Sequence, residues 1–366
     1  RKLDFRQEFI LTVTGKVVTF AFAVSVAVIY QSYWALVVGA IAGSFATLIL
    51  SYVLISYRPR LSLAKWKDLL SFSIWLTLGT WVQTVNWRST PLLFGYFLPT
   101  ALLGQYRVGH QLMGRTVAQA VKPIKSILFP AFSRLQDDSK RLRKGYMRSQ
   151  GAICLITLPV VAGVALVARD LVLLLVGEKW LPAVPVIQIY AVVQSLRALH
   201  NVNALAMATD NTKRLFFREV FLLMVRWPPI LVGIYLGRSD PYSMLIGAML
   251  GQIVSASLNT WWNMRLIAGI SPIQYLDHAS FAWRPILSVA AMIGSVLLAS
   301  SVLPGASAPL ELAARIAALS LLGAATYVGS LFAIWVFTGR GETIERELAT
   351  IIRDLAKKLI SKARAA

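Results

Sequence analysis

Ten long apolar runs, separated by short polar segments, constrain the fold of this chain most. They cover residues 9–30, 34–56, 70–97, 101–131, 147–168, 181–208, 212–237, 242–264, 285–303 and 310–337. A helix needs roughly 20 apolar residues to cross a bilayer core about 30 Å thick. Only 14% of the residues are charged, whereas a soluble domain carries about 25%. The sequence therefore predicts an all-α polytopic membrane protein with about ten transmembrane helices, and it lacks the alternating ten-residue segments of a membrane β-barrel.

The net charge of +21 is unusually high, but its placement argues against nucleic acid as a partner. Segments 1–8, 57–68, 134–148, 209–218, 265–284 and 339–366 hold 25 of the 37 basic residues, and the alternate connections hold only Arg169, Lys179 and Arg238. Such an asymmetry follows the positive-inside rule. We expect the first group of segments, and both ends of this chain, to be cytoplasmic.

Cysteine and histidine do not indicate a metal site. Cys154 is the only cysteine and lies within a predicted span, while His110, His200 and His278 are far apart in sequence. Scattered residues of this kind are typical of packing or surface positions rather than of a ligand set. We predict no metal and no cofactor.

A short sequence echo bears on the organisation of the chain. GAIAG at 39–43, after Trp34, recurs as GAMLG at 247–251, after Tyr242. The two runs fit equivalent helices of two parallel repeats, and they also fit two unrelated Gly-xxx-Gly packing faces. On the repeat interpretation, 70–264 is a six-helix C-terminal lobe, and 1–56 holds the last two helices of an N-terminal lobe whose first four helices lie upstream. The start at Arg1, inside a basic segment without a signal peptide, agrees with this interpretation.

Three further segments complete the predicted organisation. Residues 57–69 form a cytoplasmic amphipathic linker, 265–337 a linker with two additional C-terminal helices, and 338–366 a basic amphipathic cytoplasmic tail. In the tail, apolar residues such as Ile344, Ile351 and Leu355 share one helical face with basic residues around it. We expect the linker and the tail to rest on anionic membrane lipids.

Nine basic residues fall within the predicted spans, where insertion scales put the cost of a central Arg or Lys at about 2.5–3.5 kcal/mol. They are Lys16, Arg88, Arg107, Arg115, Lys122, Lys125, Arg197, Arg226 and Arg315. Of the 16 carboxylates only Glu219 lies clearly within a span. The membrane interior is therefore predicted to be cationic and mostly unpaired, which favours an anionic substrate. Pyrophosphate fits, because the guanidinium fork matches phosphate oxygens.

The position of these charges predicts a substrate path. Arg107, Gln111, Arg115, Lys122 and Lys125 fall within about 80° on one helix, although the two lysines also fit snorkelling to the cytoplasmic surface. Gln194, Arg197 and Asn201 share a face of a second helix. Arg226 and Arg88 precede prolines, which mark irregular helices that line cavities. The predicted cationic cavity comprises Arg88, Arg107, Gln111, Arg115, Lys122, Arg197, Asn201 and Arg226. Interhelical hydrogen bonding is the alternative for each arginine.

Four motifs resemble a known family. RPRLSL at 58–63, GQYRVGHQL at 104–112, FPAFSRLQ at 129–136 and GEKWLPAVP at 177–185 are similar to segments of the oligosaccharide flippases. These Wzx-like, colanic-acid-exporter-like proteins are the polysaccharide-transport branch of the multidrug/oligosaccharidyl-lipid/polysaccharide exporter superfamily. The similarity extends over nearly the whole chain.

The resemblance implies a function. Such carriers flip undecaprenyl-pyrophosphate-linked oligosaccharide repeat units across the bacterial inner membrane by alternating access, for exopolysaccharide, capsule or O-antigen (lipopolysaccharide) synthesis. They have two six-helix lobes, often with two extra C-terminal helices, so the first lobe would be incomplete here. This chain alone is then expected not to support transport. The implied protein is not an enzyme; polysaccharide polymerase and glycosyltransferases are its implied partners, and proton or sodium coupling has no assigned site.

Two other functions stay open. A multidrug exporter of the same superfamily would be expected to carry carboxylates in its membrane interior for cationic drugs. A membrane-embedded polysaccharide polymerase or ligase would need a reactive group on a sizeable outer loop. The longest outer connection, 169–180, offers Asp170 and Glu178, which we interpret as a solvated elbow rather than an acid/base pair.

The asymmetry of basic residues makes a topology prediction. Single cysteines at positions 142 and 350 should be shielded from impermeant thiol reagents in intact cells, and one at 240 should be labelled. Labelling at 142 would contradict the predicted orientation.

Overall fold

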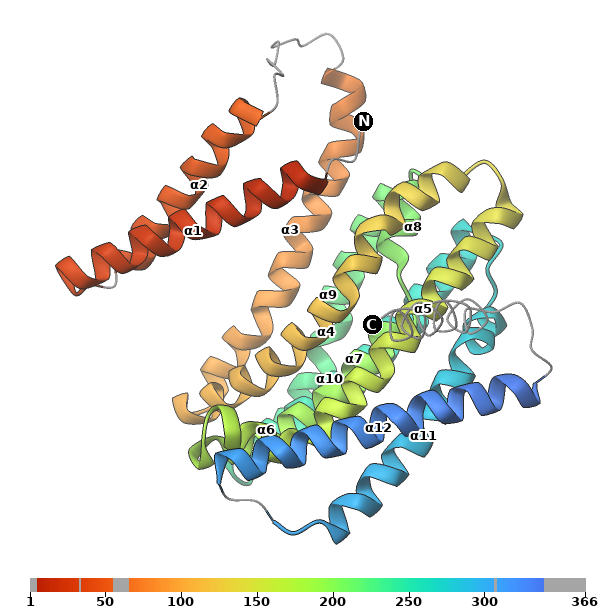
Figure 1. Cartoon of the computed structure of the whole chain (residues 1–366). Helices are drawn as coiled ribbons and strands as arrows, with labels where there is room; N and C mark the ends of the chain where they lie inside the picture. The colour runs from red at the N-terminus through yellow and green to blue at the C-terminus, as the bar shows by residue number, and fades with distance from the viewer. Residues whose placement is uncertain (1–4, 33, 55–65, 306–307, 339–366) are drawn as a thin grey trace, which may run out of the picture. The chain divides into compact units, whose positions relative to one another are not determined.

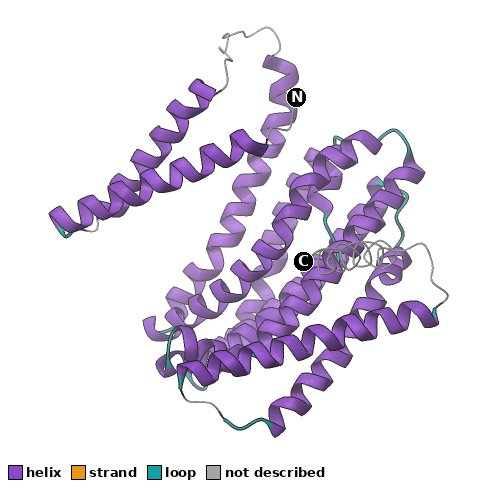
Figure 2. Ribbon diagram, in the orientation of Figure 1, coloured by secondary structure: helices purple, strands orange, loops and turns teal. Residues whose placement is uncertain are grey.

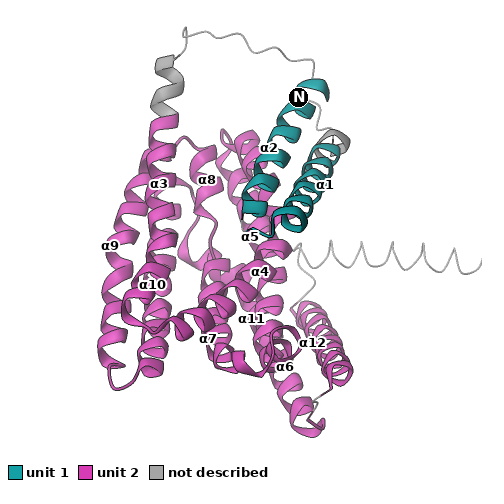
Figure 3. Cartoon of the chain, turned by 90° about the vertical axis from the view of Figure 1, so that its left-hand side faces the viewer, with its two compact units in different colours: residues 1–67 teal, residues 68–366 magenta. Residues whose placement is uncertain are grey.

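The computed structural model describes residues 5–32, 34–54, 66–305 and 308–338. Every regular element in these ranges is a helix (Figures 1 and 2). The predicted linker lies mostly, and the predicted tail almost wholly, outside these ranges. The chain divides into two compact units, residues 1–67 and 68–366 (Figure 3).

The first unit is a hairpin of two helices, α1 (Phe5–Tyr30) and α2 (Trp34–Leu54). Its close packing depends on the glycines of the first sequence echo. A Cβ atom on Gly39 would stand 2.7 Å from the carbonyl oxygen of Thr19, and one on Gly43 would stand 2.8 Å from that of Gly15. The absence of side chains at these positions therefore lets the two backbones approach.

The second unit contains the remaining helices, with α3 beginning just before its boundary. They are α3 (Trp66–Phe97), α4 (Thr100–Leu135), α5 (Ser139–Leu166), α6 (Ala168–Leu175), the 3₁₀ turn η1 (Glu178–Ala183), α7 (Val184–Ala198), α8 (Val202–Ala208), α9 (Thr212–Leu236), α10 (Pro241–Ile270), α11 (Tyr275–Val302) and α12 (Pro309–Phe337). Its largest hydrophobic cluster includes buried residues of α4, α7 and α10, among them Tyr106, Tyr190 and Met249. Gly109 lets α4 approach α7, since a Cβ there would lie 2.8 Å from Val186 Cγ1.

Each of the ten predicted spans overlaps helices of the described ranges, which confirms the all-α fold. Eight helical segments in the described ranges are long and apolar enough to cross a membrane. The other two predicted spans correspond to α3 and α4, which have 32 and 36 residues. Both are long enough to cross, but they are too polar to belong to that group of eight.

Two predicted connections are wrong because helices continue through them. Residues 265–284 are predicted as a loop, yet α10 runs to Ile270 and α11 begins at Tyr275, so polar helix ends extend the apolar spans. The predicted outer elbow at 169–180 is largely helical, and Asp170 is buried rather than solvated. Its carboxylate lies 3.4 Å from the Arg315 guanidinium of α12.

Aspartates begin two of the long helices. Asp138 accepts hydrogen bonds from the backbone N–H groups of Lys140 and Arg141, and Asp240 accepts from those of Tyr242 and Ser243, all at 2.9–3.1 Å. These bonds satisfy donors that a helix start leaves free. Leu142 is buried in the structure, so Arg141, whose side chain is 78% exposed, is the better labelling position on this turn.

The second copy of the glycine echo also packs against the preceding helix. Gly247 and Gly251 of α10 face Gly233 and Pro229 of α9, and a Cβ on either glycine would overlap the opposing backbone. Both copies are therefore packing faces in the sense of a Gly-xxx-Gly motif. Their equivalence as repeats stays a prediction.

This contact generates a stability prediction. The Gly247→Ala variant should push α9 and α10 apart and lower the free energy of unfolding by about 1–3 kcal/mol, because the close-packed backbones leave no room for a methyl group. Gly269→Ala on the same helix is the matched control, since a Cβ atom there would meet nothing within 4 Å. Thermal melting in detergent checks both variants, and equal melting temperatures would contradict the close packing of these backbones.

Candidate functional site

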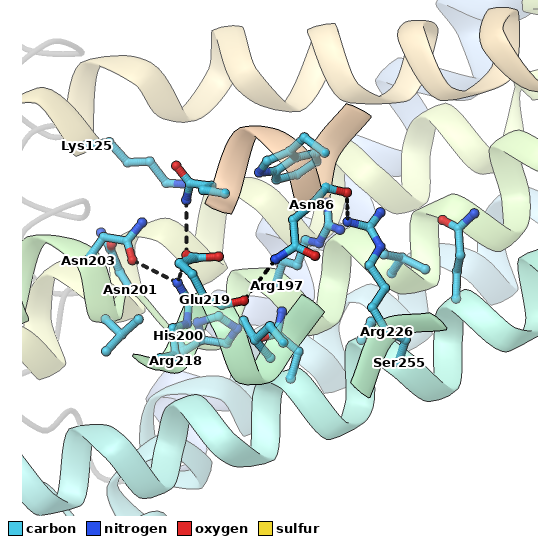
Figure 4. A pocket seen from close by; sticks show the side chains of 18 residues that line it. Asn86, Lys125, Arg197, His200, Asn201, Asn203, Arg218, Glu219, Arg226 and Ser255 are labelled. Atoms are coloured by element: carbon cyan, nitrogen blue, oxygen red, sulfur yellow. Dashed lines mark hydrogen bonds and ion pairs between the residues drawn. The ribbon is translucent and has the colours of Figure 1, made fainter. Parts of the chain in front are cut away.

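A polar cavity of about 210 Å³ lies inside the second unit, lined by residues of α3, α4, α7, α8, α9 and α10 together with the α7–α8 connection (Figure 4). Its charged lining residues are Lys125, Arg197, Arg218, Glu219 and Arg226. Side-chain amides and Trp87 make up much of the remaining wall. Four cations thus share one cavity with one carboxylate.

One of the four cations is neutralised by an ion pair within the cavity wall. Arg218 and Glu219 are buried and form an ion pair. The Arg218 guanidinium also donates to Asn263 Oδ1 at 2.8 Å and to Asn203 Oδ1 at 3.2 Å, while Gln83 Nε2 donates to Glu219 Oε1 at 3.3 Å. The pair is therefore neutral overall and well hydrogen-bonded. Arg218 does not lie in a connection between helices, as predicted for 209–218, because α9 already begins at Thr212.

Among the described residues, the side chains that contact the Arg197 guanidinium are all neutral. Its Nη1 donates to Tyr190 Oη at 3.1 Å and to Gln194 Oε1 at 3.2 Å. The guanidinium carbon lies 4.6 Å from the ring centroid of Trp87, a cation–π contact. These contacts orient the guanidinium without neutralising its charge.

Arg226 and Lys125 are likewise without a carboxylate partner among the described residues. Arg226 Nη1 donates to the backbone carbonyl of Asn86 at 2.6 Å, a bond that links α9 to α3. Lys125 reaches the cavity from α4. Three cations from three different helices therefore remain uncompensated around one cavity.

A break in the helical backbone shapes one wall. The sequence predicts a continuous span over 181–208, but α7 ends at Ala198 and α8 begins at Val202. The Ala198 carbonyl accepts hydrogen bonds from Gln150 Nε2 and, at 3.2 Å, from Cys154 Sγ, both on α5. The backbone N–H of Asn201 donates to Tyr146 Oη at 3.4 Å. Side chains of α5 thus replace hydrogen bonds that the interrupted helix lacks.

Two other helices contact further carbonyls at this break. Thr260 Oγ1 of α10 donates to the Leu196 carbonyl at 3.2 Å, and His278 Nδ1 of α11 lies 3.1 Å from the Leu199 carbonyl oxygen. A broken helix is tolerated at membrane depth where protein groups supply such partners. The break places Arg197, His200 and Asn201 on the cavity wall.

The structure brings together three of the eight predicted path residues, namely Arg197, Asn201 and Arg226. The other five are exposed on α3 or α4 and do not line this cavity. They are Arg88, Arg107, Gln111, Arg115 and Lys122. Arg197 and Asn201 do not share one helical face, because Asn201 lies in the break and has φ −137°.

The prolines do not interrupt their helices. Helix α3 continues through Pro91, and α9 continues through Pro228 and Pro229. The interruption lies at 199–201, where no proline occurs. Within the described ranges, no three His, Cys, Asp or Glu residues group in a way that could hold a metal ion.

Comparison with known proteins identifies the family. The family model described as "Polysaccharide biosynthesis protein" matches residues 1–185. This chain belongs to that family. The membership agrees with the resemblance predicted from the sequence motifs.

Relatives of this chain come from several bacteria. It is 28% identical over 258 residues to the lipopolysaccharide biosynthesis protein WzxC of Escherichia coli (strain K12), which covers 68% of this chain and 52% of WzxC. It is 24% identical over 227 residues to the teichuronic acid biosynthesis protein TuaB of Bacillus subtilis (strain 168), covering 62% of this chain and 46% of TuaB. The chain thus spans about half the length of these relatives.

The fold is also similar to that of a protein whose structure has been solved. The lipid II flippase MurJ in its inward closed conformation matches with a TM-score of 0.59 at 9% sequence identity, over 87% of this chain and 67% of MurJ. At this identity the likeness concerns the fold alone.

The buried ion pair of Arg218 and Glu219 generates a stability prediction. Glu219→Gln should lower the free energy of unfolding by about 3–5 kcal/mol, because it leaves the buried Arg218 charge without its counter-ion. Arg214→Gln, one turn before Arg218 on α9, removes an exposed charge and its hydrogen bond to the Gly269 carbonyl, and should cost much less stability. Melting in detergent compares the two, and a Glu219→Gln variant as stable as Arg214→Gln would show that the pair is not buried as described.

Proposed function

We propose that this chain is part of a carrier that moves undecaprenyl-pyrophosphate-linked oligosaccharide from the cytoplasmic to the periplasmic leaflet of a bacterial inner membrane by alternating access. The material carried would serve the synthesis of a surface polysaccharide. We propose that the protein transports this substrate and does not catalyse a reaction on it.

The observation that carries this proposal is the set of uncompensated cations in one cavity. Lys125, Arg197 and Arg226 come from α4, α7 and α9 and have no carboxylate partner in the described residues. Like charges in a cavity of low dielectric repel one another, so their arrangement favours a bound anion. A diphosphate carries the required charge, and its oxygens match the donor fork of arginine.

Family membership and the names of the relatives support the same substrate class. WzxC and TuaB are named for lipopolysaccharide and teichuronic acid biosynthesis. Both names concern the biosynthesis of a glycan, as does the description of the family. The shared chemistry that we transfer to this chain is a glycan on a lipid diphosphate.

The two alternatives fit the cavity less well. A multidrug exporter for cationic drugs needs an available carboxylate, whereas Glu219 is already paired with Arg218. A polymerase or ligase needs a reactive outer group, whereas Asp170 is buried and paired with Arg315. Neither carboxylate is free for these roles.

The exposed basic face of α4 is a second part of the proposed path. Arg107, Gln111, Arg115 and Lys122 are exposed and have no hydrogen-bond or ion-pair partner among the described side chains. We propose that this face, together with Arg88 of α3, contacts the anionic substrate outside the cavity. Anionic lipids, a polymerase and glycosyltransferases are the proposed partners, both ends of this chain are proposed to be cytoplasmic, and no coupling ion is assigned.

Neutral variants of the cavity arginines test the proposal. In cells that make the natural polysaccharide, Arg197→Gln or Arg226→Gln in the full-length protein should strongly reduce surface polysaccharide per unit of inserted protein. Each variant removes a charge-assisted contact worth about 1.5–3 kcal/mol. Arg197→Lys should retain part of the activity, because it keeps the charge but loses the fork. Arg238→Gln, on a predicted outer connection, is the control.

The basic face of α4 needs a separate variant. Arg115→Gln should also reduce surface polysaccharide while the protein stays inserted at near-normal levels. Normal output from both Arg115→Gln and Arg197→Gln would rule out anion binding by these arginines. A fall in the amount of inserted protein, with normal output per molecule, would instead show a structural role.

A further inference from the structure

A histidine outside the cavity contacts the backbone of the broken helix that forms the cavity wall. His278 lies on α11, and no residue of α11 lines the cavity. Its Nδ1 lies 3.1 Å from the carbonyl oxygen of Leu199, inside the break. The residues on both sides of Leu199, namely Arg197, His200 and Asn201, do line the cavity.

We propose that His278 is a positioning residue for the anion site, so that α11 determines where the Arg197 guanidinium lies. This inference rests on the proposed function, because it gives His278 a role in binding the substrate's diphosphate. It also gives a function to α11, a helix that does not itself line the cavity.

The geometry identifies which ring nitrogen donates to the carbonyl. A carbonyl oxygen only accepts hydrogen bonds, so Nδ1 must carry the proton and donate it. His278 is buried, and its Nε2 has no hydrogen-bond partner among the described residues. The Leu199 carbonyl is therefore the acceptor for the Nδ1 proton of this ring.

The first turn of α11 holds this histidine in place. The adjacent Asp277 forms a two-pronged ion pair with Arg143 of α5, with Nε–Oδ2 at 2.9 Å and Nη2–Oδ1 at 2.6 Å. The same carboxylate accepts the Gln274 N–H at 2.9 Å. Arg143 precedes Tyr146 by one helical turn, and the Tyr146 ring packs edge-on against His278 with centroids 5.9 Å apart. The α5 and α11 contacts to the break therefore form one connected group.

Loss of this bond should disturb binding through Arg197. Without His278 the Leu199 carbonyl would be an unsatisfied polar group in the membrane interior, which is costly. The three-residue connection would then rotate to find another donor, and the side chains on both sides of it would move. A merely structural bond would lower stability without acting specifically through Arg197.

A double-mutant cycle separates these two roles. The probe is undecaprenyl diphosphate in detergent, with undecaprenol as the uncharged control, and the readout is the dissociation constant of the purified full-length protein. The His278→Phe variant keeps the ring packing but removes the donor, and it should weaken diphosphate binding about tenfold, the equivalent of one lost hydrogen bond. In an Arg197→Gln background the same change should have almost no further effect, because the group that His278 positions is gone.

Two further variants complete the experiment. His278→Asn places an amide N–H close to the position of Nδ1–H and should restore most of the affinity. Tyr327→Phe is the matched control, because Tyr327 of α12 donates to the Leu155 carbonyl of α5 at 2.9 Å, away from the cavity lining. It should lower the melting temperature and leave the dissociation constant unchanged. If His278→Phe does not fold, His278→Leu takes its place in the cycle.

The outcomes distinguish this inference from the function on which it rests. Equal weakening by His278→Phe in both backgrounds, or unchanged binding in the wild-type background, would overturn the positioning role while leaving the anion site intact. Binding that does not distinguish undecaprenyl diphosphate from undecaprenol, or that is unchanged in Arg197→Gln, would overturn both proposals.

Discussion

Hydrocarbon offers no hydrogen-bond partner, so polar groups of this chain at membrane depth need partners inside the protein. The second unit meets this requirement at the point where α7 ends. Backbone groups of Ala198, Leu199 and Asn201 are bonded to side chains of α5 and α11. These bonds let the chain leave the helical path inside a predicted span. The same interruption places polar residues on the cavity wall.

The charges of the cavity separate into two groups. Arg218 and Glu219 neutralise each other and are hydrogen-bonded by surrounding amides, so they add polarity without net charge. Lys125, Arg197 and Arg226 have no carboxylate partner in the described residues, and their charge is available to a ligand. The anion binding that we propose rests on the second group, and the proposed diphosphate specificity rests on its two arginines. The positioning role proposed for His278 links this site to the backbone bonds that support the break.

Sequence alone predicts the fold well, because membrane spans are long and uniformly apolar. The ten predicted spans all correspond to helices, and Arg197 and Arg226 are recognisable as cavity candidates because arginine is costly in lipid. The break at 199–201 could not be predicted from helix-breaking residues, because it contains neither proline nor glycine. It depends on hydrogen-bond partners such as Gln150 and His278, which are far away in sequence. The predictions for Arg218 and Asp170 are wrong for a related reason: both residues lie near predicted span ends, and only tertiary packing shows that they are buried. The exposure of Arg107 and Arg115 on α4 likewise depends on which helices cover that face.

The most direct test of the anion site is an experimental structure of the full-length protein with undecaprenyl diphosphate bound. We predict that the phosphate oxygens lie within hydrogen-bonding distance of the Arg197 and Arg226 guanidinium groups, in the cavity whose wall contains the 199–201 break. A diphosphate bound elsewhere, with Arg197 and Arg226 keeping only their present neutral partners, would contradict this site.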